Sequence, residues 1–233
     1  MSEPDERPDW YEEAEELLAD AGLPVLVPVP MFPLGTVLFP HLLLPLHVFE
    51  PRYRAMTTDC LAGSREFAVV LIERGSEVGG AGTESRFGVA TVARIVEEAQ
   101  FADGRWALLA RGERRVRVSC WLPDDPYPVA LVEALPEPEM LPGDHAKLAE
   151  VERVVRRGLA MAAELATEST FPATVDLARD PEIAIWQLCG IAPISTVDRQ
   201  KLLEADGPTA RISLLSELGQ AANEVLAYRL GSG

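Results

Sequence analysis

The chain has 233 residues, 48% of them hydrophobic and 25% charged, a composition typical of a globular protein that can bury a sizeable core. No apolar run reaches the roughly 18 residues that a membrane span needs, and the acidic N-terminus lacks the basic start of a secretory signal. We therefore expect a cytoplasmic protein without membrane contact. Cys60, Cys120 and Cys189 are odd in number and far apart, which favours three buried thiols over disulfides or a thiol-bound metal.

The net charge of −16 is unevenly distributed. Residues 1–24 contain nine acidic residues and one arginine, a net charge of −8, and the rest of the chain carries the other −8. Such a field repels nucleic acid, so we expect no nucleic-acid partner.

The acidic segment has the pattern of an amphipathic helix. Asp9 followed by Glu12 favours a capped start, and Gly22 favours an end. Apolar residues recur between them at helical spacing: Trp10, Ala14, Leu17, Leu18 and Ala21. We expect residues 1–24 to form a helical extension that docks on the body of the protein or on a partner. The oligomeric state stays open, because the partner could be a second copy.

Residues 25–139 alternate short β-branched and aromatic runs with Pro, Gly and Asp, which predicts a β-rich domain. Strands are expected at 25–32, 36–39, 67–73, 87–97, 105–111, 114–121 and 127–135. The Asp103-Gly104 pair favours a hairpin turn between two of them. One helix is predicted at 51–62, with Pro51 at its first position.

Residues 140–233 have the apolar spacing of a helical subdomain. Before them, Pro136 to Gly143 contains three prolines and a glycine, which predicts a linker. Helices are predicted along the apolar stripe from Leu148 to Leu165, from Pro181 to Gly190, after a cap at Ser195, and after Gly207-Pro208.

The sequence lacks two common catalytic motifs. No Gly-Lys pair occurs, which excludes an ATPase phosphate loop, and no serine lies in a Gly-x-Ser-x-Gly string. Lys147 and Lys201 are the only lysines, and both fall on predicted solvent-facing helix positions, where a Ser-Lys dyad would not be activated. We therefore predict no catalytic residues.

Histidines and arginines give no clear site. His41 and His47 lack a third ligand at a recognisable spacing, so we expect no metal and no cofactor, one histidine in a loop and the other partly buried and hydrogen-bonded. In the predicted strand 114–121, alternation places Arg115 and Arg117 outward on a solvated face.

Two strings resemble the opening of the N-terminal, substrate-binding domain of Lon proteases: Met31-Phe-Pro-Leu-Gly-Thr-Val-Leu-Phe-Pro40 and Leu44-Pro-Leu-His-Val-Phe-Glu-Pro-Arg-Tyr-Arg-Ala-Met56. Segments at 87–93, 103–105, 110–118, 198–206 and 210–215 look like later parts of the same domain, with Val116 in place of the usual Phe. The resemblance spans about residues 25–225. It implies an α+β fold, a PUA-like β pseudo-barrel followed by a C-terminal helical bundle, in a free-standing bacterial member of the family.

The resemblance also implies polypeptide substrates or a partner protein. Phe39, Leu42 and Leu43 are hard to bury together between prolines, so we expect them to leave apolar surface open for an extended peptide. The candidate peptide-binding residues are Phe39, His41, Leu42, Leu43 and Arg52.

The other residues of the second string have expected structural roles. Phe49 and Tyr53 are expected to fill the barrel core. Glu50 is expected either to pair with Arg52 or to cap the helix that Pro51 begins.

Three functions remain. The first is a non-catalytic polypeptide-binding module without ATPase or protease domains. The second is an uncharacterised hydrolase acting from the cleft between the two domains. The third is an RNA-binding protein, which a PUA-like fold permits and the negative charge disfavours.

Overall fold

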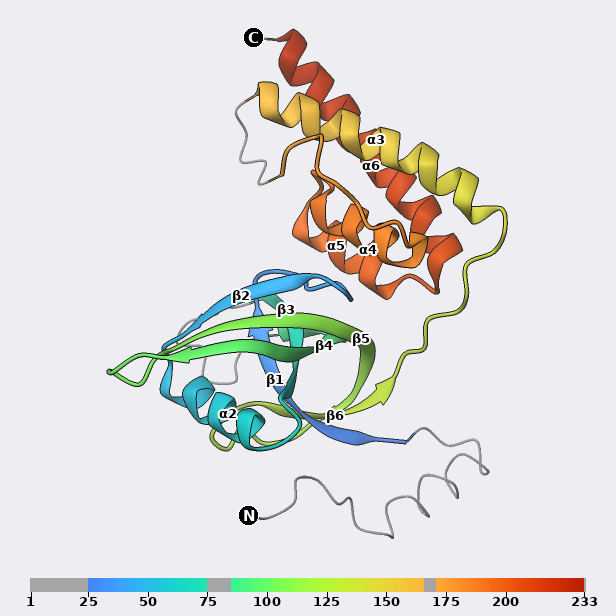
Figure 1. The fold of residues 1–233 in the computed structure, drawn as a ribbon. Helices are drawn as coiled ribbons and strands as arrows, with labels where there is room; N and C mark the ends of the chain where they lie inside the picture. Colours follow the sequence, from blue (N-terminus) through green and yellow to red (C-terminus); the bar gives the residue numbers. More distant parts are fainter. Residues whose placement is uncertain (1–24, 75–84, 166–170, 233) are drawn as a thin grey trace. The chain divides into compact units, whose positions relative to one another are not determined.

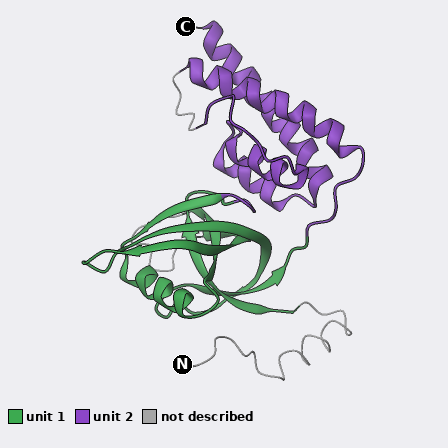
Figure 2. Ribbon diagram, viewed as in Figure 1, with its two compact units in different colours: residues 1–38, 43–136 green, residues 39–42, 137–233 purple. Residues whose placement is uncertain are grey.

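The computed structural model describes residues 25–74, 85–165 and 171–232. The predicted N-terminal helix lies outside these residues. The described chain forms two compact units (Figures 1 and 2). Unit 1 contains the chain up to Leu38 and Leu43–Pro136, and unit 2 contains Phe39–Leu42 and the chain from Glu137 onward. The domain limits at 24/25 and 139/140 remain a proposal.

Unit 1 is a sheet of six strands with one helix. The strands are β1 (Val27–Leu34), β2 (Leu43–Val48), β3 (Glu66–Arg74), β4 (Ser85–Gln100), β5 (Trp106–Trp121) and β6 (Val129–Ala134), and the helix is α2 (Pro51–Ala62). Neighbouring strands run in the order β2-β5-β4-β3-β1-β6, and β5 also pairs with β6. Five strands therefore close into a barrel, and β2 lies outside the ring.

The length of β5 makes this closure possible. The first half of its 16 residues pairs with β2, and the second half pairs with β6. Among the described strands, β1 and β3 are the one parallel pair, and the other pairs are antiparallel. The side chains between the strands form an apolar core from Val29, Met31, Ala68, Val70, Ala90, Val92, Val116, Ala130 and Val132. The predicted α+β class is thus confirmed.

Helix α2 matches its prediction at 51–62 and lies against the sheet (Figure 1). Its Tyr53 ring packs 4.3 Å from the ring of Phe32 on β1, measured between centroids. Met56 and Cys60, one and two turns further on, are also buried. The apolar face of the helix therefore extends the barrel core.

Two strand predictions were wrong. Residues 36–39 are not a strand, because the Leu38 carbonyl accepts a hydrogen bond from the Thr91 hydroxyl (2.6 Å) instead of joining a ladder. The strand lies later, at β2, where Leu44, Leu46 and Val48 turn inward opposite β5. The two strands expected at 105–111 and 114–121 are one, because the β4 partner ladder continues past Glu113 through a bulge.

Unit 2 is helical, as predicted. It contains α3 (Asp144–Glu164), α4 (Pro181–Ile191), α5 (Thr196–Glu204) and α6 (Pro208–Gly231), with α3 and α6 side by side (Figure 1). Ser195 caps α5 as expected, since its hydroxyl accepts a hydrogen bond from the Asp198 N–H (3.1 Å). No helix in the described ranges is long and apolar enough to cross a bilayer.

Candidate functional site

The five residues proposed to bind peptide are divided between the two units. Phe39 is only 1% exposed and packs in unit 2, where its ring centroid lies 5.8 Å from that of Trp186. Leu42 is half-buried against Gly190 of α4, so closely that a Cβ on that glycine would lie 2.4 Å from Leu42 Cδ1. These two side chains serve the packing of unit 2.

The other three predicted residues are closer to solvent. His41 is exposed in a turn with a positive φ of 65°. Arg52 lies 3.3 Å from the Glu50 carboxylate and its guanidinium carbon lies 4.5 Å from the Tyr53 ring centroid. The predicted pairing of Glu50 with Arg52 is therefore confirmed, and the alternative is wrong, because the Glu50 side chain does not cap α2. Leu43, at the start of β2, is 57% exposed.

Two neighbouring expectations need correction. Phe49 is 50% exposed instead of filling the core, whereas Tyr53 is buried as expected. His47 is exposed instead of partly buried, because β2 alternates and its odd-numbered residues point away from the barrel. The His47 ring lies 5.5 Å from that of Phe101, which sequence reasoning did not identify because it is distant along the chain and adjacent only through strand pairing.

These residues belong to one surface, which we call the β2 face. Side chains that are paired across neighbouring strands lie on the same side of a sheet. The β2–β5 register and one ring contact therefore group seven outward residues: Leu43, Pro45 and His47 of β2, Ala107, Leu109 and Arg111 of β5, and Phe101, which contacts His47. Five of the seven are apolar, and Leu43 and Phe101 are the most exposed large apolar ones (57% and 45%).

The β2 face borders an open strand edge. β2 pairs with β5 on one side, and within the described ranges no strand pairs with its other side. An open edge presents main-chain donors and acceptors that can pair with another extended chain. Pro45 is compatible with this position, since proline in a sheet is confined to edges and bulges.

Charged residues around the β2 face are paired with one another. Arg105 lies 2.7 Å from Asp103, and Arg111 lies 2.9 Å from Glu113. The rim is therefore polar and locally neutral, while the centre of the face is apolar. This is the usual anatomy of a protein-binding surface.

A further ion-pair cluster lies on β3, β4 and β5. Glu66 accepts hydrogen bonds from Arg94 (2.6 Å) and Arg114 (2.8 Å). Partial burial raises the pKa of Glu66, but hydrogen bonds and charges from both arginines outweigh this and hold the pKa below its usual range. Arg115, expected to point outward, is instead buried, because the bulge at Glu113 shifts the alternation of β5.

Unit 1 also has a small cavity of about 340 Å³ beside the β4–β5 hairpin. We call it the hairpin cavity. It is lined by Pro51, Arg54, Ala55 and Thr58 of α2, and by Gln100, Gly104 and Trp106 of the hairpin and its strands. Its wall is mainly polar.

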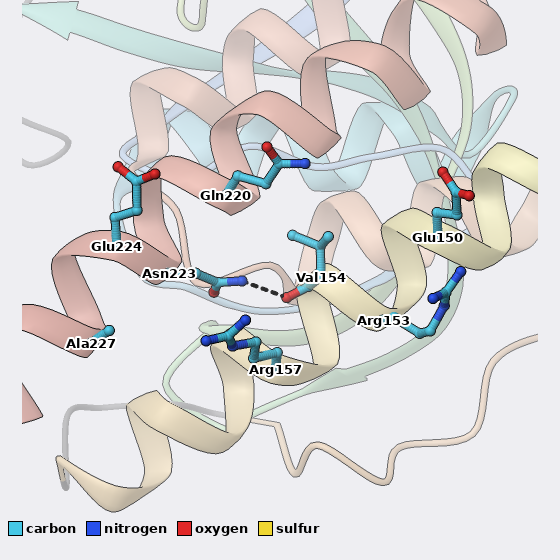
Figure 3. Close-up of a pocket in the computed structure, with 8 residues that line it drawn as sticks. All are labelled: Glu150, Arg153, Val154, Arg157, Gln220, Asn223, Glu224 and Ala227. Carbon is cyan, nitrogen blue, oxygen red and sulfur yellow. Dashed lines mark hydrogen bonds between the residues drawn. The ribbon is translucent and has the colours of Figure 1, made fainter.

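Unit 2 has a larger hollow of about 580 Å³ between α3 and α6 (Figure 3). Its lining residues are Glu150, Arg153, Val154, Arg157, Gln220, Asn223, Glu224 and Ala227. The Asn223 amide donates to the Val154 carbonyl (3.0 Å) at its floor and ties the two helices together. Two arginines and two glutamates surround it, so it offers neither an apolar centre nor a net charge.

Two of the three thiols are poorly suited to act as nucleophiles. Burial is the main cause that raises the pKa of both Cys60 and Cys189 to about 12, so both stay protonated at neutral pH. Cys120 is exposed, which corrects the expectation of three buried thiols.

In the described part of the chain, no three His, Cys, Asp or Glu side chains gather where they could hold a metal ion.

Comparisons with known proteins agree with this picture. Residues 28–220 match the family model of the ATP-dependent protease La (LON) substrate-binding domain. The chain is 27% identical to Lon protease 2 of Sorangium cellulosum over 206 residues, which are 86% of this chain and 25% of that protein. It is 24% identical to a LON peptidase N-terminal domain and RING finger protein of Schizosaccharomyces pombe, over 96% of this chain and 49% of that protein. The chain thus spans about a quarter of the length of the Lon proteases that it matches.

Solved structures agree in fold. The Lon N-terminal domain protein from Xanthomonas campestris aligns with a TM-score of 0.57 and 27% identity, covering 81% of this chain and 96% of that one. The N-terminal domain of Lon protease from Mycobacterium avium complex aligns with a TM-score of 0.58 at 19% identity, over 83% of this chain and 98% of that one, which supports the fold alone. The chain therefore belongs to the Lon substrate-binding domain family.

Proposed function

We propose that this protein is a non-catalytic module that binds extended polypeptide segments on the β2 face. One observation carries the proposal: large apolar side chains are exposed at both ends of the edge strand β2, Leu43 at its start and Phe101 beside His47 near its end. Membership of a substrate-binding domain family supports the same role.

The binding mode follows from the geometry of the edge. An extended peptide can add to β2 as a further strand, with main-chain hydrogen bonds providing affinity for any sequence. Every second peptide side chain would then point toward the β2 face, where Leu43, His47 and Phe101 select apolar residues. The substrate class is therefore an unfolded segment with apolar residues at alternate positions.

A direct binding measurement tests this proposal. Fluorescence anisotropy of a labelled, amidated peptide with alternating leucine and serine would be recorded against the full chain and against Leu43→Asp plus Phe101→Asp. We expect the double variant to bind at least about tenfold more weakly, because two charges replace apolar contacts worth about 1–2 kcal/mol each. Val197→Asp is the matched control, since Val197 is 52% exposed on α5 of unit 2.

Equal affinity of the double variant and the wild type would contradict the β2 face as the binding site. The same samples distinguish the hydrolase alternative, because mass spectrometry after long incubation reports whether the peptide is cleaved. Under the proposal, the bound peptide stays intact.

A further inference from the structure

The hairpin cavity is lined by an arginine, Arg54, that forms no ion pair with a carboxylate among the described residues. Arg54 projects from α2 toward the β4–β5 turn, and a Cβ on Gly104 would lie 1.9 Å from its Nη2 atom. The guanidinium thus occupies the space that a larger residue at 104 would fill. Asp103, the neighbouring acid, is hydrogen-bonded by the Arg105 side chain at 2.7 Å, and the charge of Arg54 attracts it without an ion-pair contact. In the described part of the chain, no carboxylate forms an ion pair with Arg54.

The other walls of the cavity suit a small anionic group attached to an apolar body. Thr58 and Gln100 contribute polar atoms beside Arg54, and the half-buried Trp106 contributes an apolar wall. A volume of about 340 Å³ is at the lower end of the range for ligand pockets, which fits one residue of a peptide and not a folded partner.

The cavity also lies at the end of the β2 edge. β2 ends at Val48, and Pro51, a wall of the cavity, follows three residues later, so the two are separated by at most about 11 Å. Gln100 and Trp106, which line the cavity, pair with each other, and Trp106 pairs with the buried Val48, so the cavity lies on the opposite side of the sheet from His47. Side chains of a peptide strand added to β2 point alternately to the two sides of the sheet, so a residue about three positions beyond the end of β2 can reach the cavity on that side.

We propose that the hairpin cavity receives a carboxylate of the polypeptide bound on the β2 face, with Arg54 as its charged partner. The inference rests on the proposed function and narrows the substrate class to apolar segments that end in, or are flanked by, a carboxylate. The group is either the C-terminal carboxylate or an Asp or Glu side chain, since the guanidinium recognises both in the same bidentate way.

Three labelled peptides of one alternating leucine and serine sequence separate these sources. The first has a free C-terminal carboxylate, the second is amidated, and the third is amidated with glutamate before its last residue. We expect the wild-type chain to bind at least one carboxylate-bearing peptide about tenfold more tightly than the plain amide, as for a hydrogen bond to a charged group. The peptide that gains affinity identifies the carboxylate.

Variants then assign the gain to Arg54. Arg54→Gln should remove the preference for the carboxylate and leave the affinity of the plain amide unchanged, which also shows that the variant is folded. Arg54→Lys should retain part of the preference, because it keeps the charge and loses the bidentate geometry. Arg229→Gln, an exposed arginine near the end of α6, is the matched control and should retain all of it.

The outcomes separate the two proposals. If the wild-type chain binds all three peptides equally, the carboxylate site is overturned and the β2 face stands. A preference that persists in Arg54→Gln also overturns it, because the carboxylate is then recognised elsewhere. Failure of every peptide to bind overturns both proposals together.

Discussion

The two units differ in where their ion pairs lie. In unit 1 the pairs Arg94–Glu66 and Arg105–Asp103 involve side chains that reach solvent. In unit 2 one ion pair includes a fully buried side chain, because Arg211 is 0% exposed and its guanidinium carbon lies 3.6 Å from the Trp186 ring centroid. Both units leave large apolar side chains partly in solvent, such as Leu43 in unit 1 and Val197 in unit 2. The buried cluster of Arg211 and Trp186 therefore contributes to the stability of unit 2, whereas surface ion pairs contribute little.

The buried cluster contacts both segments that connect unit 1 to unit 2 along the chain. Arg211 pairs with Glu137, the first residue after unit 1, and donates to the carbonyls of Leu202 (3.0 Å) and Ala205 (3.3 Å). Phe39, the other point of passage, packs on the same Trp186. A buried arginine with these partners satisfies its charge and fixes the path of the chain.

Loss of the buried arginine should have the largest effect. Arg211→Ala removes the ion pair, the ring contact and two carbonyl hydrogen bonds, so we expect the free energy of unfolding to fall by about 3–5 kcal/mol. Urea denaturation followed by circular dichroism measures it. Arg229→Ala, on the same helix but exposed, should change stability by less than about 0.5 kcal/mol. Similar losses in the two variants would remove the contrast between buried and surface charge.

The short segment from Phe39 to Leu43 contains one buried and one exposed apolar residue, so truncating each compares the two units directly. Phe39→Ala should lower the free energy of unfolding by about 3 kcal/mol, because it leaves a cavity against Trp186. Leu43→Ala, four residues later and 57% exposed, should cost less than about 1 kcal/mol. Thermal unfolding of both variants makes the comparison. A small cost for Phe39→Ala would mean that the segment does not stay packed in solution.

The hairpin turn should be moderately sensitive. Gly104 has a φ of 81°, a conformation that other residues adopt with strain, so Gly104→Ala should cost about 1 kcal/mol and displace the Arg54 guanidinium. Gly88→Ala is the control, since nothing lies within 4 Å of an added Cβ there. Chemical denaturation of the pair measures the difference, which would vanish if the turn relaxes freely.

The smallest effect concerns pH. The pKa of Glu66 is lower in the folded chain than the unfolded value of about 4.3, so its ionised form stabilises the fold above that pH. This contribution is lost as pH falls through the folded-state pKa. Glu66→Gln should therefore reduce stability by less than about 1 kcal/mol at pH 7 and flatten its decline below about pH 4. Urea midpoints between pH 3 and pH 7 test this, with the exposed Glu97→Gln as control.

Local patterns in the sequence were sufficient for the helices and the turn. Pro51, Ser195 and Pro208 mark helix starts through backbone constraints and capping, which act within a few residues. Asp103-Gly104 forms the hairpin turn for the same reason. The family motif likewise predicted the fold, because its strings match over most of the chain.

The candidate site was only partly predictable. Leu43 was named in advance, but Phe39 and Leu42, from the same apolar run, pack in unit 2. His47 and Phe101 were not combined in advance, because they are 54 residues apart and meet only through the β2–β5 pairing and the following hairpin. An apolar run in the sequence indicates that some of its side chains are buried. It does not show which of them are buried or against which residues they pack.

The sequence by itself determined the helices of the described chain, the α+β class and the absence of a Gly-Lys phosphate loop, since these depend on local spacing and residue identity. Only the tertiary structure decided that β2 is an edge strand, that Arg211 is buried, and that Arg54 lies beside Gly104. These features arise from contacts between residues distant in sequence, where strand register and packing, and not local propensity, place each side chain.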